Sequence, residues 1–335
     1  MPAQAPAQAH TGTREPRSSQ GSMRGGSAHG VPGAVPEAVP GAVPGGGPAP
    51  ADVARAAAEL VACGSLEMGA DTPEDARRIA RLLPTGTPVY VNHLPKRDIG
   101  ASLETLVALK RAGLEPVPHL AARRIGSRAE AQDFLEKAVR RAGVTKALLI
   151  AGDIAVPAGP YADSAALLAE DFVGRSGLTQ VGLAGYPEGH PRIATVALNG
   201  ALARKLELAA GHGLKTHLVT QFSFAPNRIV EYCADVARRA PGLPVYVGLA
   251  GPTSPVGLAR YAQRCGVSAS LRALQTEGIK AVRVFTCVDP TEQLMALAAR
   301  LRSGSAGNVV GVHLYSFGGV VRTAEWMNTR ITARG

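Results

Sequence analysis

The feature that most constrains the fold is an alternation, from residue 53 onward, of short apolar runs with amphipathic stretches. The runs carry Val, Leu, Ala and Ile at consecutive positions, which is typical of strands buried on both faces of a parallel sheet. Eight runs can be placed, at residues 60–68, 89–92, 116–120, 147–151, 180–184, 216–222, 244–250 and 309–315. Eight strands that alternate with helices predict the α/β class and, within it, a single (β/α)8 barrel of the TIM type.

Between these runs, apolar residues recur at intervals of three and four positions, which predicts amphipathic helices. The clearest patterns cover residues 76–83, 103–112, 129–142, 164–173, 197–210 and 229–239. Residues 280–288 are rich in Val and Phe and would pass for a ninth strand. Because eight strands already complete a barrel, we interpret this segment as a helix between the seventh and eighth strands.

Residues 1–50 differ in composition from the rest of the chain. Ala, Gly, Pro, Ser and Gln dominate them, and Val-Pro recurs every four residues from position 35. A segment with so few large apolar side chains cannot build a core. We therefore predict a disordered tail over residues 1–50 and one barrel domain over residues 51–335. The tail is either a partner-binding segment or, as we favour, a linker or a mis-assigned start with Met23 as another candidate.

The formal net charge of +10 would attract an anionic partner, such as nucleic acid, a membrane surface or a small molecule. The Lys and Arg residues are scattered along helical segments, and aromatic residues make up only 4% of the chain, so the stacking platforms of nucleic-acid-binding proteins are scarce. No apolar run approaches the roughly 18 residues of a membrane span. We predict a small anionic ligand, and neither nucleic acid nor a membrane as a partner.

The four cysteines, Cys63, Cys233, Cys265 and Cys287, are too far apart for a C-x-x-C metal site. We therefore predict reduced thiols and no metal. The first thirty residues lack the apolar block of a secretory signal, which predicts a cytoplasmic location. Homo-oligomers are common among such barrels, but nothing in the sequence marks an interface.

The active site of a (β/α)8 barrel lies at the C-terminal ends of its strands, so polar residues that follow apolar runs are the candidates. They are Glu67, His119, Gly152, Asp153, Tyr186, His190, Gln221 and Tyr315. Glu67 stands between apolar residues, where desolvation raises the pKa of a carboxyl and suits it to be a general acid, although a plain strand-end charge is the alternative. Asp153 follows Gly152, which lets a ligand approach closely, but it could equally cap a helix or a turn.

Histidine and phosphate-binding patterns give less information. A lone histidine is more often structural than catalytic, and the Pro- and Gly-framed loop favours His190 over His119 as a positioned side chain. Neither G-x-x-x-x-G-K-[ST] nor a helix-opening G-x-G-x-x-G is present. A dinucleotide would therefore have to bind through barrel loops.

Four motifs of the chain resemble the methylenetetrahydrofolate reductase family. The most specific is Gly-Tyr-Pro-Glu-Gly-His-Pro at residues 185–191. The others are Pro-His-Leu at 118–120, Gly-Asp at 152–153 and Thr-Gln-Phe at 220–222. Their order and approximate separations match the family, and the likeness runs from about residue 60 to the C-terminus.

The resemblance implies a barrel that holds FAD across its mouth, is reduced by NADH or NADPH, and passes a hydride to methylenetetrahydrofolate to give methyltetrahydrofolate. By position in the motifs, Glu67 would be the acid that opens the folate ring to an iminium ion. Asp153 would lie near flavin and pterin, and Gln221 would face the substrate. The implied cofactor contacts are His119, Gly152, Asp153, Tyr161, Ala162, Tyr186, His190, Arg204 and Lys205, and Tyr315 is the implied aromatic contact to the substrate.

The chain departs from the family pattern at cofactor and folate-tail contacts. Ala151 stands where flavin-binding members carry Arg, Ala201 where they carry Asn, and Ser223 follows the Gln motif in place of a usual Asp. The acid, Asp153 and Gln221 remain. Three alternatives stay open: a flavin-independent or repurposed reductase acting on another folate or iminium-like substrate, a non-catalytic folate-binding subunit, and another barrel enzyme such as an aldolase, for which no strand-end Lys is evident.

Overall fold

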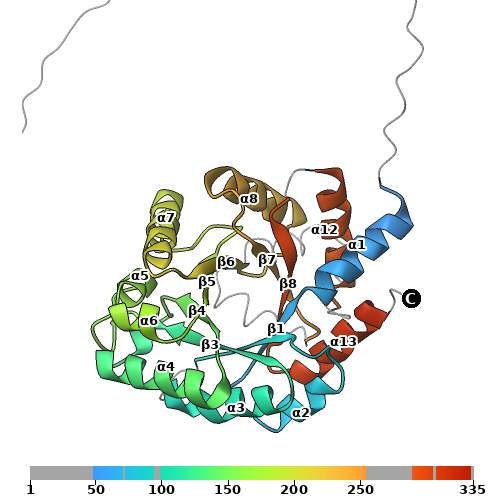
Figure 1. The fold of residues 1–335 in the computed structure, drawn as a ribbon. Helices are drawn as coiled ribbons and strands as arrows, with labels where there is room; N and C mark the ends of the chain where they lie inside the picture. Colours follow the sequence, from blue (N-terminus) through green and yellow to red (C-terminus); the bar gives the residue numbers. More distant parts are fainter. Residues whose placement is uncertain (1–47, 71, 94–98, 254–288, 305–306, 333–335) are drawn as a thin grey trace, which may run out of the picture. The chain divides into compact units, whose positions relative to one another are not determined.

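A computed structural model describes residues 48–335 with gaps at 71, 94–98, 254–288, 305–306 and 333–335. Eight parallel strands pair in chain order, and β8 pairs with β1 to close the barrel (Figure 1). They are β1 Ser65–Met68, β2 Pro88–Val91, β3 Glu115–Ala121, β4 Lys146–Ile150, β5 Gln180–Gly185, β6 Lys215–Thr220, β7 Val245–Ala250 and β8 Val309–Tyr315. The predicted (β/α)8 barrel is confirmed.

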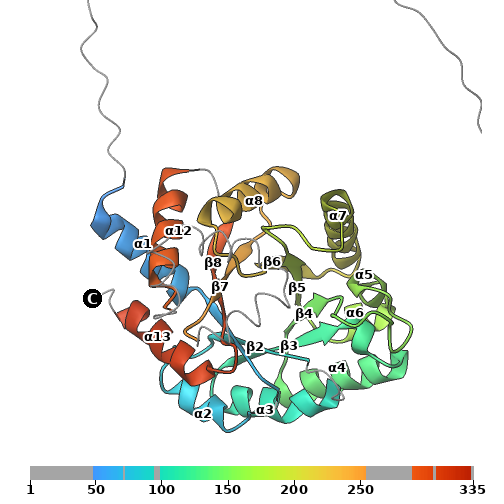
Figure 2. The ribbon, with the colours of Figure 1, turned by 180° about the vertical axis from the view of Figure 1, so that it is seen from behind.

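Helices form a ring outside the strands, as the two opposite views show (Figures 1 and 2). They are α1 Pro50–Ala62, α2 Asp75–Ala80, α3 Leu103–Arg111, α4 Arg128–Ala142, α5 Ser164–Leu168, α6 Asp171–Arg175, α7 Thr195–Gly211, α8 Pro226–Arg239, α12 Thr291–Ser303 and α13 Val320–Thr332. Two short 3-10 helices are also present: η1 Ile99–Ser102 precedes α3, and η2 Ala122–Arg124 follows β3. No helix in the described part of the chain is long and apolar enough to cross a membrane.

The first strand is shorter than the sequence predicts, because residues 60–62 belong to α1. Val53, Ala57 and Val61 form a buried stripe at helical spacing, and α1 packs on α12 and α13. The chain then turns at Gly64, where a Cβ would lie 2.8 Å from the carbonyl oxygen of Val312. The apolar run therefore combines a helix end and a strand, which composition alone does not separate.

One helix prediction changes, and another falls outside the described residues. The helix predicted over 164–173 is divided into α5 and α6, because Glu170 takes an extended backbone conformation while its carboxylate accepts hydrogen bonds from Tyr161 and Arg128. The helix predicted over 280–288 lies outside the described residues, as does all but the end of the predicted tail over 1–50. The other helices predicted from the sequence are present with shifted ends.

The interior of the barrel is a separate small core in which aromatic and imidazole rings lie among the branched aliphatic side chains usual in this fold. Tyr90, Val117, Leu148 and Val219 pack together there, and the imidazoles of His217 and His313 are also buried. Glycine residues leave room for these rings, because a Cβ at Gly182 on β5 would lie 2.7 Å from Nε2 of His217. At Gly248 on β7 a Cβ would lie 2.8 Å from the ring of Tyr315.

We expect Gly182→Ala to destabilise the protein by about 1–3 kcal/mol, because the added methyl group collides with His217 and with Leu148, 2.9 Å away. Gly200→Ala in α7 is the matched control, since no atom lies within 4 Å of its Cβ position and alanine favours the helix. Urea unfolding of both variants measures the difference. Equal stabilities would contradict the proposed packing of the barrel interior.

Candidate active site

A carboxylate and two imidazoles meet inside the C-terminal half of the barrel. Oε2 of Glu67 on β1 lies 3.7 Å from Nε2 of His119 on β3 and 3.7 Å from Nε2 of His313 on β8. The Asn92 amide, just after β2, also interacts with this carboxylate. The side chain of Glu67 is 15% exposed, whereas that of His313 is fully buried. The barrel thus surrounds one acid with polar groups from three other strands or strand ends.

The pKa of Glu67 is lower than its ordinary value. Burial by itself would raise it, but the interactions with His313, with His119 and with the Asn92 amide together outweigh burial. The sequence-based expectation of a raised pKa is therefore wrong for the protein without a ligand. Apolar neighbours in sequence indicated desolvation, but they did not reveal the imidazoles that the fold brings to the carboxylate.

The histidines differ in their surroundings. Burial lowers the pKa of His119 to about 4, although nearby Glu67 acts in the opposite direction. His313 is anchored through Nδ1, which lies 2.8 Å from the hydroxyl oxygen of Ser65. Deeper in the barrel, the Tyr90 hydroxyl lies 2.8 Å from Nε2 of His217, and burial lowers the pKa of His217 to about 4. His119 and His217 are therefore neutral near pH 7.

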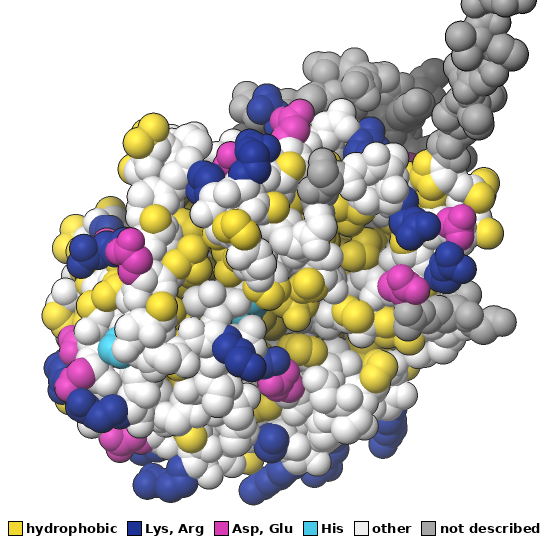
Figure 3. Space-filling model, turned by 45° about the horizontal axis from the view of Figure 1, so that its top comes forward, with side chains coloured by type: hydrophobic (Ala, Val, Ile, Leu, Met, Phe, Trp, Pro, Cys, Tyr) yellow, Lys and Arg dark blue, Asp and Glu magenta, His cyan; other side chains and the backbone are white. Residues whose placement is uncertain are grey.

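An aromatic wall stands beside this cluster. Tyr315, at the end of β8, donates a hydrogen bond of 2.9 Å to the carbonyl oxygen of Thr220, and its ring contacts Phe222 and Phe317. Gln221 accepts a hydrogen bond at its side-chain oxygen from the backbone N–H of Phe222, which fixes the orientation of its amide. Figure 3 shows a hollow in the molecular surface with hydrophobic side chains around it and a histidine at depth. Such a surface suits a flat, partly apolar ring system.

Asp153 stands at the rim rather than inside the barrel. Its carboxylate forms an ion pair with Arg124 of η2, and its side chain is 60% exposed. Gly152 before it has a φ of +91°, a conformation that favours glycine. The close approach of a ligand at Gly152 and the role of Asp153 both stay predictions.

Two of the expected cofactor contacts have other partners. Tyr161 is 2% exposed in the outer core, and its hydroxyl donates a hydrogen bond to Glu170. Burial raises the pKa of Tyr161 to about 12. The carbonyl oxygen of Ala162 accepts a hydrogen bond from Arg123. Tyr161 is thus part of the packing beside α5, whereas Ala162 is exposed and accepts its hydrogen bond at the backbone.

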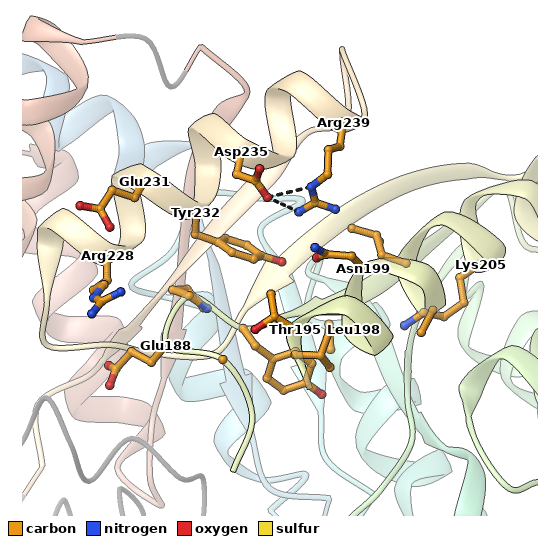
Figure 4. A pocket seen from close by; sticks show the side chains of 16 residues that line it. Glu188, Thr195, Leu198, Asn199, Lys205, Arg228, Glu231, Tyr232, Asp235 and Arg239 are labelled. Atoms are coloured by element: carbon orange, nitrogen blue, oxygen red, sulfur yellow. Dashed lines mark hydrogen bonds and ion pairs between the residues drawn. The ribbon is translucent and has the colours of Figure 1, made fainter. Parts of the chain in front are cut away.

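A cavity of about 280 Å³ lies between α7, α8 and the loop after β5 (Figure 4). Tyr232 and Asn199 point into the space between the helices, and Arg239 pairs with Asp235. The cavity is lined by Ala184, Tyr186, Pro187, Glu188, Gly189, Thr195, Leu198, Asn199, Ala201, Leu202, Lys205, Arg228, Glu231, Tyr232, Asp235 and Arg239. Cations and anions alternate around it, so it offers contacts to a polar ligand without one dominant charge.

Of the residues expected to bind a cofactor, Tyr186 and Lys205 line this cavity. Burial lowers the pKa of Lys205, and the negative charge of Asp163 opposes this shift. His190 packs its ring edge-on against Tyr186, 5.3 Å between centroids, and burial together with Arg192 lowers its pKa. Arg204 is exposed on α7. These side chains therefore divide between the cavity, its margin and the outer surface.

Several polar residues of the site were not predicted from the sequence. They are Ser65, Tyr90, Asn92, His217, Arg228, Tyr232 and His313. A signal for some of them exists, because side chains two positions apart on a strand face the same way. Ser65 precedes Glu67 by two residues, and His313 precedes Tyr315 by two, so inward-facing partners could have been sought there.

The fold and the polar cluster at the barrel mouth define a (β/α)8-barrel protein of the kind that carries an enzyme site. The family model for methylenetetrahydrofolate reductase matches residues 73–315, and the chain belongs to that family. In general terms it is a folate-related reductase.

Solved structures with a similar arrangement are distant. The Yersinia pestis DHPS with a pterine-sulfa conjugate is 14% identical, with 81% of this chain and 93% of that chain covered and a TM-score of 0.41. A putative phosphonomutase from Burkholderia cenocepacia is 12% identical, with coverage of 79% and 93% and a TM-score of 0.45. At these sequence identities and TM-scores, neither similarity gives information about the substrate.

The buried neutral histidines predict a pH-dependent stability. The unfolded chain binds protons at His119 and His217 below a pKa of about 6.5, whereas the folded protein binds them only near pH 4. The free energy of unfolding should therefore fall as pH decreases from 6.5 to 4, by about 3 kcal/mol for each ring as an order of magnitude. Urea unfolding across this range measures the slope. The free energy of unfolding should depend less steeply on pH in His217→Gln than in the wild type. An unchanged slope would exclude His217 as a source of the pH dependence.

Proposed function

We propose that the protein reduces methylenetetrahydrofolate to methyltetrahydrofolate with a hydride that originates from NADH or NADPH. The observation that carries this proposal is the Glu67 carboxylate, held between two imidazoles beside the aromatic wall of Tyr315, Phe222 and Phe317. The carboxylate suits a reaction that passes through a cation, and the wall suits a pterin ring. Membership of the reductase family supports the same chemistry.

The proposed role of Glu67 is to deliver a proton and then to balance a charge. Opening the methylene bridge places a proton on the leaving ring nitrogen and leaves an iminium cation, which accepts a hydride to give a neutral methyl group. Entry of the folate displaces water from Glu67, which is 15% exposed, and so favours its protonated form. After proton transfer, the same carboxylate is an anion that stabilises the cation until the hydride arrives.

Asp153 and Gln221 are proposed to act on the bound substrates. The Gln221 amide, oriented by Phe222, would donate a hydrogen bond from its NH₂ group to the pterin. Asp153, at the rim, would orient the hydride donor through polar contacts, with Arg124 holding its carboxylate. Both roles follow the positions of these residues in the family motifs.

FAD is the hydride carrier that the family implies, and when bound it supplies the transfer between nicotinamide and substrate. The described residues fit it poorly. The hydroxyl of Tyr161 is used by Glu170 in the core, Arg204 is exposed, and Ala151 and Ala201 stand where the family pattern has Arg and Asn. This favours the alternative of a flavin-independent reductase, in which nicotinamide donates the hydride directly.

The absorption spectrum and a turnover assay test the proposal together. Purified protein should oxidise NADH or NADPH only when methylenetetrahydrofolate is present. A flavin band that NADH bleaches and methylenetetrahydrofolate restores would establish the FAD-dependent form. A colourless protein that turns over without added FAD would establish the direct form, and no turnover in either case would refute the proposed function.

Glu67→Gln should lower kcat by about 10²- to 10⁴-fold, since it removes the acid and the counter-charge while keeping the shape of the side chain. Glu136→Gln is the control, because Glu136 is exposed on α4 and distant in sequence from every candidate residue. Steady-state kinetics with saturating folate give kcat for both variants. A Glu67→Gln enzyme with the wild-type rate would remove Glu67 from the mechanism.

A further inference from the structure

Ser65, Glu67 and His313 form a fixed unit where the two ends of the barrel sheet meet. Ser65 pairs in register with His313 across the β1–β8 seam, and Leu66 pairs with Leu314. His313 lies between the two polar residues of β1: its Nδ1 is 2.8 Å from the Ser65 hydroxyl, and its Nε2 is 3.7 Å from Oε2 of Glu67. His313 is completely buried, and Ser65 is 1% exposed.

The Glu67 carboxylate favours one position for the proton of a neutral His313 imidazole, and the Ser65 hydroxyl can match it. If the Ser65 hydroxyl donates to Nδ1, a neutral imidazole carries its proton on Nε2, which faces the Glu67 carboxylate. The opposite arrangement would set a lone pair of Nε2 against an anion and is unfavourable. Within the described residues the buried Nε2 makes no hydrogen bond of ordinary length, and the Glu67 carboxylate faces it at 3.7 Å.

Two aromatic rings hold the imidazole in this orientation. Tyr90 meets it edge-on at 4.7 Å between centroids, and Tyr315 does so at 4.8 Å. Rotation of the His313 ring would collide with one or the other. The donor that faces Glu67 is therefore oriented before any substrate binds.

Other polar groups around the carboxylate do not share this anchoring. His119 approaches Glu67 from β3 at the same 3.7 Å, but burial lowers its pKa to about 4, with smaller contributions in the same direction from His313 and His93. The Asn92 amide interacts from the end of β2. Tyr90 and Tyr315 supply ring edges. Among these groups His313 combines complete burial, a hydrogen-bonded Nδ1 and a ring fixed on both sides.

We propose that His313, oriented by Ser65, is a positioning residue that fixes the Glu67 carboxylate and stabilises its anionic form. This inference rests on the proposed function, because the role of Glu67 in folate reduction is part of that proposal. His313 acts through Glu67 and does not touch the substrate. Its effect should therefore be seen in kcat and in the titration of Glu67, and little in the KM for folate.

Two substitutions at His313 separate its contacts. In His313→Gln the side-chain amide reaches the position of Nε2 and can still face Glu67. In His313→Asn the shorter amide reaches only the position of Nδ1 and can bond only Ser65. We expect His313→Asn to lower kcat by about 10- to 100-fold, whereas His313→Gln should stay within a few-fold of wild type. The KM for methylenetetrahydrofolate should change little in both.

The pH dependence adds a readout that a purely structural role would not move. Loss of the donor removes a group that favours the anion, so the pKa of Glu67 should rise in His313→Asn and its titration should shift to higher pH. Carbon-13 NMR of glutamate carboxyl groups, with the Glu67 signal assigned by its absence in Glu67→Gln, measures this directly. Ser65→Ala should shift the signal in the same direction by a smaller amount.

The outcomes are distinguishable. If both His313 variants lose activity in proportion to their loss of folded protein, and the Glu67 signal titrates as in the wild type, then His313 is only a packing residue and the inference is wrong. If wild-type protein fails to reduce methylenetetrahydrofolate, the proposed function is wrong, but the Glu67 titration in His313→Asn still decides whether His313 stabilises the carboxylate. A shift in His313→Asn that is absent in His313→Gln supports the inference.

Discussion

The interior of this barrel depends on one constraint: an acid placed among apolar strands must have partners. A buried carboxylate loses its hydration, and a fold can retain it as an anion only by supplying donors nearby. Here the Glu67 carboxylate is surrounded by His313, His119 and Asn92, which come from three other parts of the sheet. These polar neighbours need partners in their turn, so polar groups extend from the mouth into the barrel.

Glycine allows this arrangement. A barrel of eight strands has an interior just wide enough for its side chains, and rings fit only where neighbours are small. Gly182 leaves room for the imidazole of His217, and Gly248 leaves room for the ring of Tyr315. The two rings then reach other polar groups, since His217 bonds the Tyr90 hydroxyl and Tyr315 packs against His313. Small residues on β5 and β7 are thus part of how the site is built.

The sequence was sufficient to predict the fold because the strands are short and apolar, and the first six are each followed by a recognisable helical pattern. The prediction of elements was wrong where one apolar run contains the end of a helix and a strand, as at residues 60–68. Burial in a helix and burial in a strand require the same residue types. In the site, Glu67, Gln221 and Tyr315 could be found as strand-end residues. His313 could not be connected with Glu67, because nearly the whole barrel separates them in sequence and only closure of the sheet makes them neighbours.

The seam between β1 and β8 has a consequence for how activity arises as the chain is made. Every other strand pair joins neighbours in sequence, whereas this pair joins the first strand to the last. A nascent chain that has formed seven strands still presents Glu67 without His313 beside it. The site is therefore completed by the same event that completes the fold. Partly synthesised or C-terminally shortened chains would be inactive, and would not merely act on a wider range of substrates.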